Sequence, residues 1–450
     1  MPDVILPLEH TTWLNEQPEN VLSAREGQLY FLSKYTFSHP RLHRDTLEAN
    51  LARTAMILCL QTLQTQVWDE LVVALDDAWG HDTEWRSVNV YHTMWTVVAR
   101  TANRAVVGAP LCRDEGFLAA VKAYVEYFAT QGVLIRFLCP DLLKPVLGRL
   151  LAQPVHWRYR NLLSGYLTPL AERLASGGIM GEDTFSAWLS EAAQKEIDPA
   201  DGTPDAVAGQ IASAEFAPLH TSTFAVVNTL LDLLTSPGAQ HHLDALRDEA
   251  DSVLINGDSA SWQKSTHLQL DLADSAIKES QRVTRTSGKA LLRRVVAHGV
   301  ILSDGTSLPK GVYVGLSMEG AHQDPDFYEH PERFEPFRFA KATPSSDTDS
   351  GVEFDSDPDK APAGRDSVAS RPRKLVTTGP DYLSFGHGKH GCPGRFFVAQ
   401  FLTIMLALIS QKYDIQPLSK KPKGHHISDH YKPPEDAMIM IRRRASAGRP

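Results

Sequence analysis

The chain has 450 residues, of which 42% are hydrophobic and 22% charged, a composition that can bury a sizeable core. Its net charge of −9 excludes a typical nucleic-acid-binding protein, because such a protein needs a basic face. Only four cysteines occur, which excludes a disulfide framework and favours a reducing compartment. Met1–Asn20 has neither the order of a signal peptide nor a long apolar span, so the chain is expected to be soluble as written.

Helical periodicity dominates the first two thirds of the chain, and the period then shortens. Apolar residues recur at three-and-four spacing, with glycines or Pro-Gly turns at the ends. The expected helices are Arg44–Ala78, Val88–Val107, Lys122–Phe137, His156–Leu174, Ala208–Leu234 and Leu268–Thr284. Strands are expected at Leu291–Ile301 and Gly311–Leu316, around the turn Asp304-Gly305. The predicted fold class is mainly α with small β-sheets, an α+β architecture.

Two segments after the strands are predicted to be irregular. Gly320–Arg338 is rich in Pro, His and aromatic residues without a period, and is expected to be an ordered loop. Lys341–Arg373 is crowded with Ser, Asp, Pro and Ala, and buries too little apolar surface to offset its ordering entropy. Residues 341–373 are therefore predicted to be a flexible acidic insertion within a single domain that spans residues 1–450.

The segment Ser384–Arg395 carries the chemistry, and it has several interpretations. It contains G-x-G-x-x-G, but Pro393 and the lack of a strand–helix–strand unit disfavour a dinucleotide site. The spacing of its two histidines and one cysteine matches no zinc pattern. A single thiolate on haem iron fits best, because Cys392 directly precedes the expected helix Gly394–Ile409, whose positive end favours an anionic sulfur. A buried, inert cysteine is the remaining alternative.

The spacing F-x-x-G-x-x-x-C-x-G in this segment resembles the haem loop of the cytochrome P450 superfamily. Its four positions are filled by Phe385, Gly388, Cys392 and Gly394. The resemblance implies haem b, held between a long distal helix and the loop Phe385–Gly394, called the Cys-loop below, with its proximal helix. Cys392 is then expected to be the axial ligand of the iron. Phe385 is expected to pack beside the ring and shield the sulfur. His390 and Arg294 are expected to pair with the haem propionates.

The same resemblance implies a structural ion network near the haem. The family carries Glu-x-x-Arg on a helix, and Glu279 and Arg282 match it on one helix face. The family's third member lies in a P-x-x-F-x-P-x-R-F loop, which selects Arg338 and leaves Arg333 as a surface residue. These three residues are expected to lock the core and not to act in catalysis.

The expected helix Ala208–Leu234 departs from the family pattern where it should cross the distal haem face. The family carries A-G-x-D/E-T there, an acid–alcohol pair that passes protons to bound dioxygen. Thr221 matches the alcohol, but His220 replaces the acid and Pro218 replaces the glycine. His220 is interpreted either as a proton relay or as a packed helix residue. Pro218 removes one helix hydrogen bond, so a local bulge is expected there.

The chain is similar to fungal family members of secondary metabolism. The predicted function is therefore a monooxygenase that oxidises an apolar natural-product scaffold of terpenoid, indole-diterpene or polyketide type. It would use O2 and NADPH-derived electrons from NADPH–cytochrome P450 reductase, with cytochrome b5 as a further partner. Alternatives are a non-catalytic or vestigial haem- or ligand-binding protein and a redox-neutral, haem-dependent rearrangement catalyst. Relatives sit on the cytoplasmic face of the endoplasmic reticulum membrane and carry an anchor and opening strands, which are expected to be absent here.

Overall fold

The structure is a computed structural model that describes most of the chain in two compact units. It describes residues 3–29, 33–37, 47–140, 142–177, 184–195, 202–254, 262, 265–340, 373–427 and 429–445, without the side chains of residues 47–62. The first unit comprises Met1–Ala24, Leu75–Met94 and Ser222–Pro450, and the second comprises Arg25–Ala74 and Trp95–Thr221.

Helices make up the second unit within its described residues. They are α2 (Ala24–Gln28), most of α3 (Leu47–Trp79) and α4 (Val90–Val106), α5 (Glu115–Leu138), α6 (Lys144–Arg158), α7 (Ser164–Ala175), α8 (Phe185–Ala193), α9 (Pro204–Ala214) and the start of α10 (Phe216–Thr235). Side-chain caps fix several starts: the Asp114 carboxylate accepts from the Phe117 amide at 2.7 Å, before α5. The buried Glu70 carboxylate binds Arg100 and Arg113, at 2.7 and 2.6 Å.

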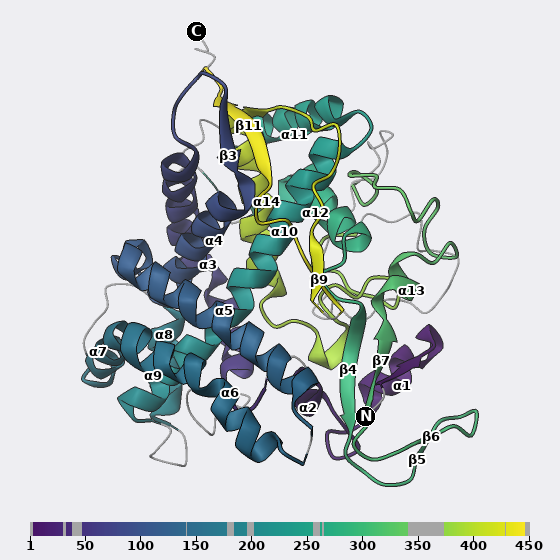
Figure 1. Cartoon of the computed structure of the whole chain (residues 1–450). Helices are drawn as coiled ribbons and strands as arrows, with labels where there is room; N and C mark the ends of the chain where they lie inside the picture. Colours follow the sequence, from purple (N-terminus) through teal and green to yellow (C-terminus); the bar gives the residue numbers. More distant parts are fainter. Residues whose placement is uncertain are drawn as a thin grey trace. The chain divides into compact units, whose positions relative to one another are not determined.

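The largest sheet among the described residues of the first unit has four strands. Its order is β1 (Asp3–Leu6), β7 (Tyr313–Ser317), β4 (Lys289–Val295) and β2 (Leu22–Ser23), and β4 and β7 lie side by side (Figure 1). β1 is parallel to β7, while the other pairs are antiparallel. Smaller sheets are β3 (Arg86–Asn89) with β11 (Met438–Arg443) and β8 (Tyr413–Ile415), β5 (Val300–Ile301) with β6 (Ser307–Leu308), and β9 (His425–Ile427) with β10 (His430–Lys432).

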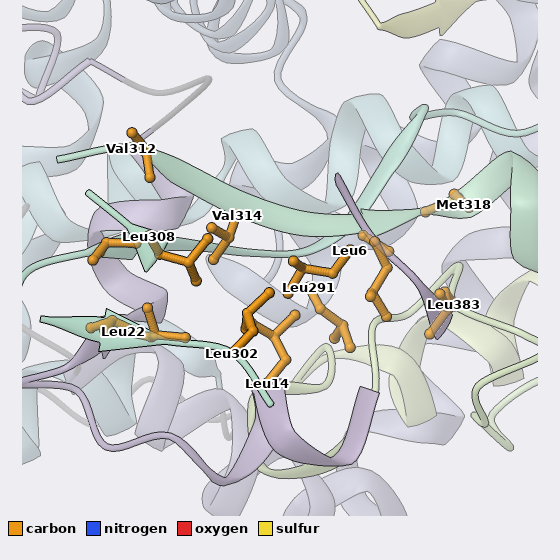
Figure 2. Close-up of a cluster of buried hydrophobic side chains, with 14 of the residues drawn as sticks. Leu6, Leu14, Leu22, Leu291, Leu302, Leu308, Val312, Val314, Met318 and Leu383 are labelled. Carbon is orange, nitrogen blue, oxygen red and sulfur yellow. The ribbon is translucent and has the colours of Figure 1, made fainter. Parts of the chain in front are cut away.

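Apolar side chains from the four-stranded sheet converge on one core (Figure 2). Leu6, Leu22 and Val314 come from its strands, and Leu14 comes from α1 (Thr11–Glu16). Leu383, which is fully buried, joins this core from the segment just before the Cys-loop. The start of that loop is therefore tied to the sheet by burial of apolar surface.

Two helices of the first unit pack against α14 (Arg395–Lys412). α11 (Ala239–Val253) and α12 (Asp271–Val283) both contact it, and a short helix, α13 (Met318–His322), follows β7. Among the described residues, α14 is the one helix long and apolar enough to cross a bilayer, and most of it is buried in the structure. Its burial agrees with the core helix predicted from Gly394 to Ile409.

The predicted fold class is confirmed, whereas several element boundaries are wrong. The single helix predicted over His156–Leu174 is α6 and α7, joined by the π-helical turn Tyr159–Leu163. The helix predicted over Ala208–Leu234 is broken at Glu215 into α9 and α10. Pro218 explains this break, because it has no N–H for the carbonyl four residues earlier.

Other differences are smaller. The strand predicted over Leu291–Ile301 is β4 followed by the first strand of the β5–β6 hairpin, and the predicted loop Gly320–Arg338 begins inside α13. The prediction also omits α8, α11 and the two N-terminal strands. The predicted acidic insertion lies outside the described residues, except for Arg373.

Candidate functional site

The chain leaves the sheet core at Leu383, and the Cys-loop that follows is closed by backbone hydrogen bonds. The Gly386 amide donates to the Leu383 carbonyl at 2.9 Å, and the Cys392 amide donates to the Phe385 carbonyl at 2.7 Å. The Cys392 carbonyl accepts from Nη1 of Arg395 at 3.0 Å. Cys392 is half-buried and stands three residues before the first residue of α14.

Glycines are required at two turns of this loop. Gly386 and Gly388 have φ of +68° and +66°, which side-chain-bearing residues rarely adopt. A Cβ on Gly388 would also approach Nδ2 of Asn15 to 3.0 Å. At Gly394, two residues after Cys392, a Cβ would instead meet open space. The loop therefore presents its cysteine at the end of a helix, beside an open region.

The structure brings Glu279, Arg282 and Arg338 together. The fully buried Glu279 carboxylate accepts from Nε and Nη2 of Arg282, at 2.7 and 2.8 Å, and from Nε of Arg338 at 3.0 Å. The Glu335 amide donates to the same carboxylate at 3.1 Å. A buried carboxylate with two cations and four donated hydrogen bonds is well compensated for its lost hydration.

Arg282 uses its other N–H groups on backbone carbonyls. Nη1 donates to the carbonyls of His322 and Pro331, at 2.7 and 2.6 Å, and Nη2 donates to that of Arg333 at 2.9 Å. The side chain of Arg333 is exposed, as predicted for a surface residue, but its carbonyl belongs to the network. The network thus fastens the segment after α13 to α12.

Other buried polar residues of α12 hold both flanks of the segment 341–372. On one side, the Phe339 amide donates to Oγ of Ser275 at 2.9 Å. On the other, the Leu375 amide donates to Oδ2 of Asp274 at 2.7 Å. The fully buried Lys278 ammonium donates to the carbonyls of Lys374 and Thr377 at 2.8 and 2.9 Å. Burial lowers the pKa of Lys278.

The sequence prediction missed His322, Lys278 and the Arg373–Asp381 ion pair. Lys278 directly precedes the Glu-x-x-Arg motif, which is the one local signal that pointed to it. His322 had no such signal, because a lone histidine in an aperiodic segment suggests no role.

Arg293 and Arg294 are neighbours on β4 with different surroundings. Arg294, the predicted propionate partner, donates to the Gly311 carbonyl at 3.4 Å and stacks over Tyr313. Arg293 is buried, and burial lowers its pKa to about 10. Its guanidinium donates to two uncharged acceptors, the Leu292 carbonyl at 3.1 Å and Oδ1 of Asn15 at 3.4 Å, and the Glu19 carboxylate opposes the effect of burial on its pKa.

A β-bulge between Ala290 and Arg293, with Leu291 at a φ of +51°, sets which side of β4 each of these arginines faces. Asn15 also contacts the Gly388 position of the Cys-loop, so Arg293 lies close to that loop. His390 is the other predicted propionate partner, and its Nε2 lies 3.9 Å from Oε1 of Glu19.

The predicted proton-delivery residues lie near the start of α10. Most of this helix is buried, yet Ala217 and Thr221 are exposed and His220 and Phe224 are half-buried, which makes one accessible strip. Oγ1 of Thr221 donates to the Ala217 carbonyl at 2.7 Å, and the His220 ring packs against Phe216. These side chains are therefore accessible, unlike most of the helix.

These features fit a haem group. Cys392 offers a single soft ligand, and among the described residues no three His, Cys, Asp or Glu side chains are grouped to hold a metal ion. The buried guanidinium of Arg293, with its uncharged acceptors, suits a propionate carboxylate. A Cβ at Gly394 would have no other heavy atom within 4 Å, so the described chain does not fill the space next to this residue.

Comparisons with known proteins agree with this site. A family model described as Cytochrome P450 matches residues 13–439. "Cytochrome P450 monooxygenase tenB" of Beauveria bassiana is 28% identical over 98% of this chain and 82% of its own length. "Cytochrome P450 monooxygenase lnaC" of Aspergillus flavus is 30% identical, with the same coverage of both chains. "Cytochrome P450 monooxygenase polB" of Polytolypa hystricis is 29% identical over 98% of this chain and 84% of its own.

The fold, the Cys-loop and the buried Glu–Arg–Arg network agree with the family to which these comparisons assign the chain. The chain belongs to the cytochrome P450 family, the monooxygenase class of these enzymes.

Proposed function

We propose that the chain binds haem b through the thiolate of Cys392 and oxidises an apolar natural-product scaffold. The scaffold would be of terpenoid, indole-diterpene or polyketide type, because the sequence resembles fungal enzymes of secondary metabolism. Dioxygen would be the oxidant, and NADPH–cytochrome P450 reductase would supply two electrons, with cytochrome b5 as a second donor. The same resemblance implies the cytoplasmic face of the endoplasmic reticulum. The observation that carries the proposal is the closed loop from Phe385 to Gly394 before α14.

Haem, when bound, supplies the chemistry of dioxygen activation. The residues of the chain hold and tune it. The positive end of α14 favours the anionic form of the Cys392 sulfur, and Phe385 shields that sulfur from water. Arg293 is favoured over Arg294 as a propionate partner, because it is the more deeply buried cation. His390 would pair with a second carboxylate.

Thr221 and His220 would move protons at the distal side. Thr221 is exposed on the α10 strip, and its hydroxyl, which donates to the Ala217 carbonyl in the structure, would rotate to donate to a bound ligand instead. His220 precedes it by one residue, and an imidazole can exchange protons near neutral pH. Replacement of either residue by alanine should lower the product formed per NADPH consumed, with haem binding unchanged.

The test is the reduced, carbon monoxide-bound difference spectrum of the wild type beside Cys392→Ala. The wild type should show the thiolate-type Soret band near 450 nm, and Cys392→Ala should lack it. Cys112→Ala is a matched control, since Cys112 is a free, fully buried cysteine of the second unit. A wild type without that band would refute thiolate ligation.

Turnover with the reductase and NADPH then separates the enzyme from a vestigial haem-binding protein. Product analysis separates oxygen insertion from a redox-neutral rearrangement, because only the former adds an atom from dioxygen.

A further inference from the structure

His322 joins the Glu–Arg–Arg network to the Cys-loop. It is the last residue of α13 and is fully buried. Its backbone carbonyl accepts from Nη1 of Arg282 at 2.7 Å. Its ring stacks on Tyr382, with 5.4 Å between the centroids and 11° between the planes. His322 is therefore held in place through both its backbone carbonyl and its ring.

The two ring nitrogens contact opposite partners. The Leu383 amide donates to Nε2 of His322 at 3.0 Å, so Nε2 carries no proton. Nδ1 must then carry the proton, and it donates to the Arg282 carbonyl at 3.3 Å. Burial, with Arg282 and Arg285 nearby, lowers the pKa of His322 to about 3. The ring therefore stays neutral, and the bridge stays intact, at ordinary pH.

Leu383 transmits this contact to the cysteine. Its side chain is fixed in the sheet core (Figure 2), and its carbonyl accepts from the Gly386 amide at 2.9 Å. Two residues after Leu383, the Phe385 carbonyl accepts from the Cys392 amide at 2.7 Å. The Leu383 amide that His322 holds is thus a fixed point nine positions before Cys392 in the sequence.

We propose that His322 is a positioning residue for the thiolate: by holding the Leu383 amide against the Arg282 backbone, it sets where the Cys-loop places Cys392. This inference rests on the proposed ligation of haem by Cys392. The buried network then acts on the metal site through one imidazole, in the way that outer-shell partners orient metal ligands.

Two substitutions separate the hydrogen bonds from the packing. His322→Phe keeps a flat ring against Tyr382 and removes both ring hydrogen bonds, which leaves the Leu383 amide buried without an acceptor. His322→Gln keeps one donor and one acceptor on a side chain of similar reach. The haem-loaded full chain is measured for the reduced carbon monoxide spectrum and for the rate of haem transfer to an apoglobin.

In His322→Phe, most of the Soret absorbance of the carbon monoxide complex should move from the thiolate band to a shorter wavelength. This variant should also release haem roughly tenfold faster than the wild type. His322→Gln should restore the thiolate band and keep haem release within about twofold of the wild type. If His322→Phe does not accumulate as folded protein, His322→Asn takes its place, because its side chain is too short to reach both partners.

Asp76→Asn is the control for destabilisation alone. Asp76 binds Lys412 at 2.9 Å and Arg443 at 2.6 Å, which are not partners of His322 or Leu383. This variant should have a lower melting temperature than the wild type, but below that temperature it should keep the wild-type spectrum. A wild-type spectrum in the Phe or Asn variant, or an equal spectral loss in Asp76→Asn, overturns the inference. A wild type without the thiolate band overturns the proposed function instead.

Discussion

Glu215 offers a direct test of the electrostatics of the second unit. It lies at the break between α9 and α10, and its carboxyl group is fully buried. Burial raises the pKa of Glu215 from its ordinary 4.5 to about 8, and the neighbouring Asn103 side chain opposes this only in part. The folded chain therefore keeps this group protonated at neutral pH. We expect Glu215→Gln, which is neutral at every pH, to stabilise the protein.

The size of the effect follows from proton linkage. Between pH 4.5 and 8 the unfolded carboxyl ionises while the folded one does not, so the wild type loses stability as the pH rises. Each pH unit in this range costs about 1.4 kcal/mol, which gives about 3 kcal/mol at pH 7. A chain of this length unfolds with an entropy near 0.9 kcal/mol per degree, so the melting temperature should rise by about 3 °C.

Thermal melts at pH 5, 7 and 8 measure the difference in melting temperature between the wild type and Glu215→Gln. The two melting temperatures should agree to within about 1 °C at pH 5 and diverge as the pH rises. Glu172→Gln is the matched control, because Glu172 is an exposed glutamate of the same unit, and its melting temperature should follow the wild type throughout. A difference between the wild type and Glu215→Gln that does not grow with pH would refute the reasoning.

Arg338→Ala removes one of two cations from the buried Glu279 carboxylate and should destabilise the protein by about 3–5 kcal/mol, seen as a fall of several degrees in melting temperature. A change within about 1 °C would contradict that role. Replacement of residues 341–372 by a short Gly–Ser linker should leave the melting temperature and the carbon monoxide spectrum unchanged, since both flanks bind consecutive residues of α12; a change in either would show that the anchors are insufficient. Arg293→Gln should speed haem transfer to an apoglobin roughly tenfold, and Arg294→Gln should stay within about twofold; the opposite order would assign the propionate to Arg294.

The Cys-loop and the ion network were predictable because their chemistry is carried by side chains at fixed spacing. Glu279 and Arg282 are three residues apart on one helix, and the pattern around Arg338 selects it over Arg333. The acceptors that satisfy the other N–H groups of Arg282 were not predictable, because they are backbone carbonyls, which every residue carries whatever its side chain. Arg333 shows this clearly: its side chain is exposed while its carbonyl is essential to the arrangement.

The short strands could not be predicted for a related reason. β2 has two residues, and it exists because Leu22 and Ser23 pair with Val295 and Arg294, far along the chain. β1 likewise forms against β7. Periodicity needs more residues than either strand contains, so pairing at long range decides them. The long helices, by contrast, carry enough turns to be recognised locally.

α12 has a further consequence for the order in which the chain folds. Its buried face is polar, with Asp274, Lys278, Glu279 and Arg282 all inside the protein. On its own this helix would gain little by collapsing, because burial of these groups is unfavourable until their partners arrive. Those partners lie about 40 to 100 residues later in the chain. The part of the first unit around α12 is therefore expected to assemble cooperatively, and only after synthesis has passed Thr377.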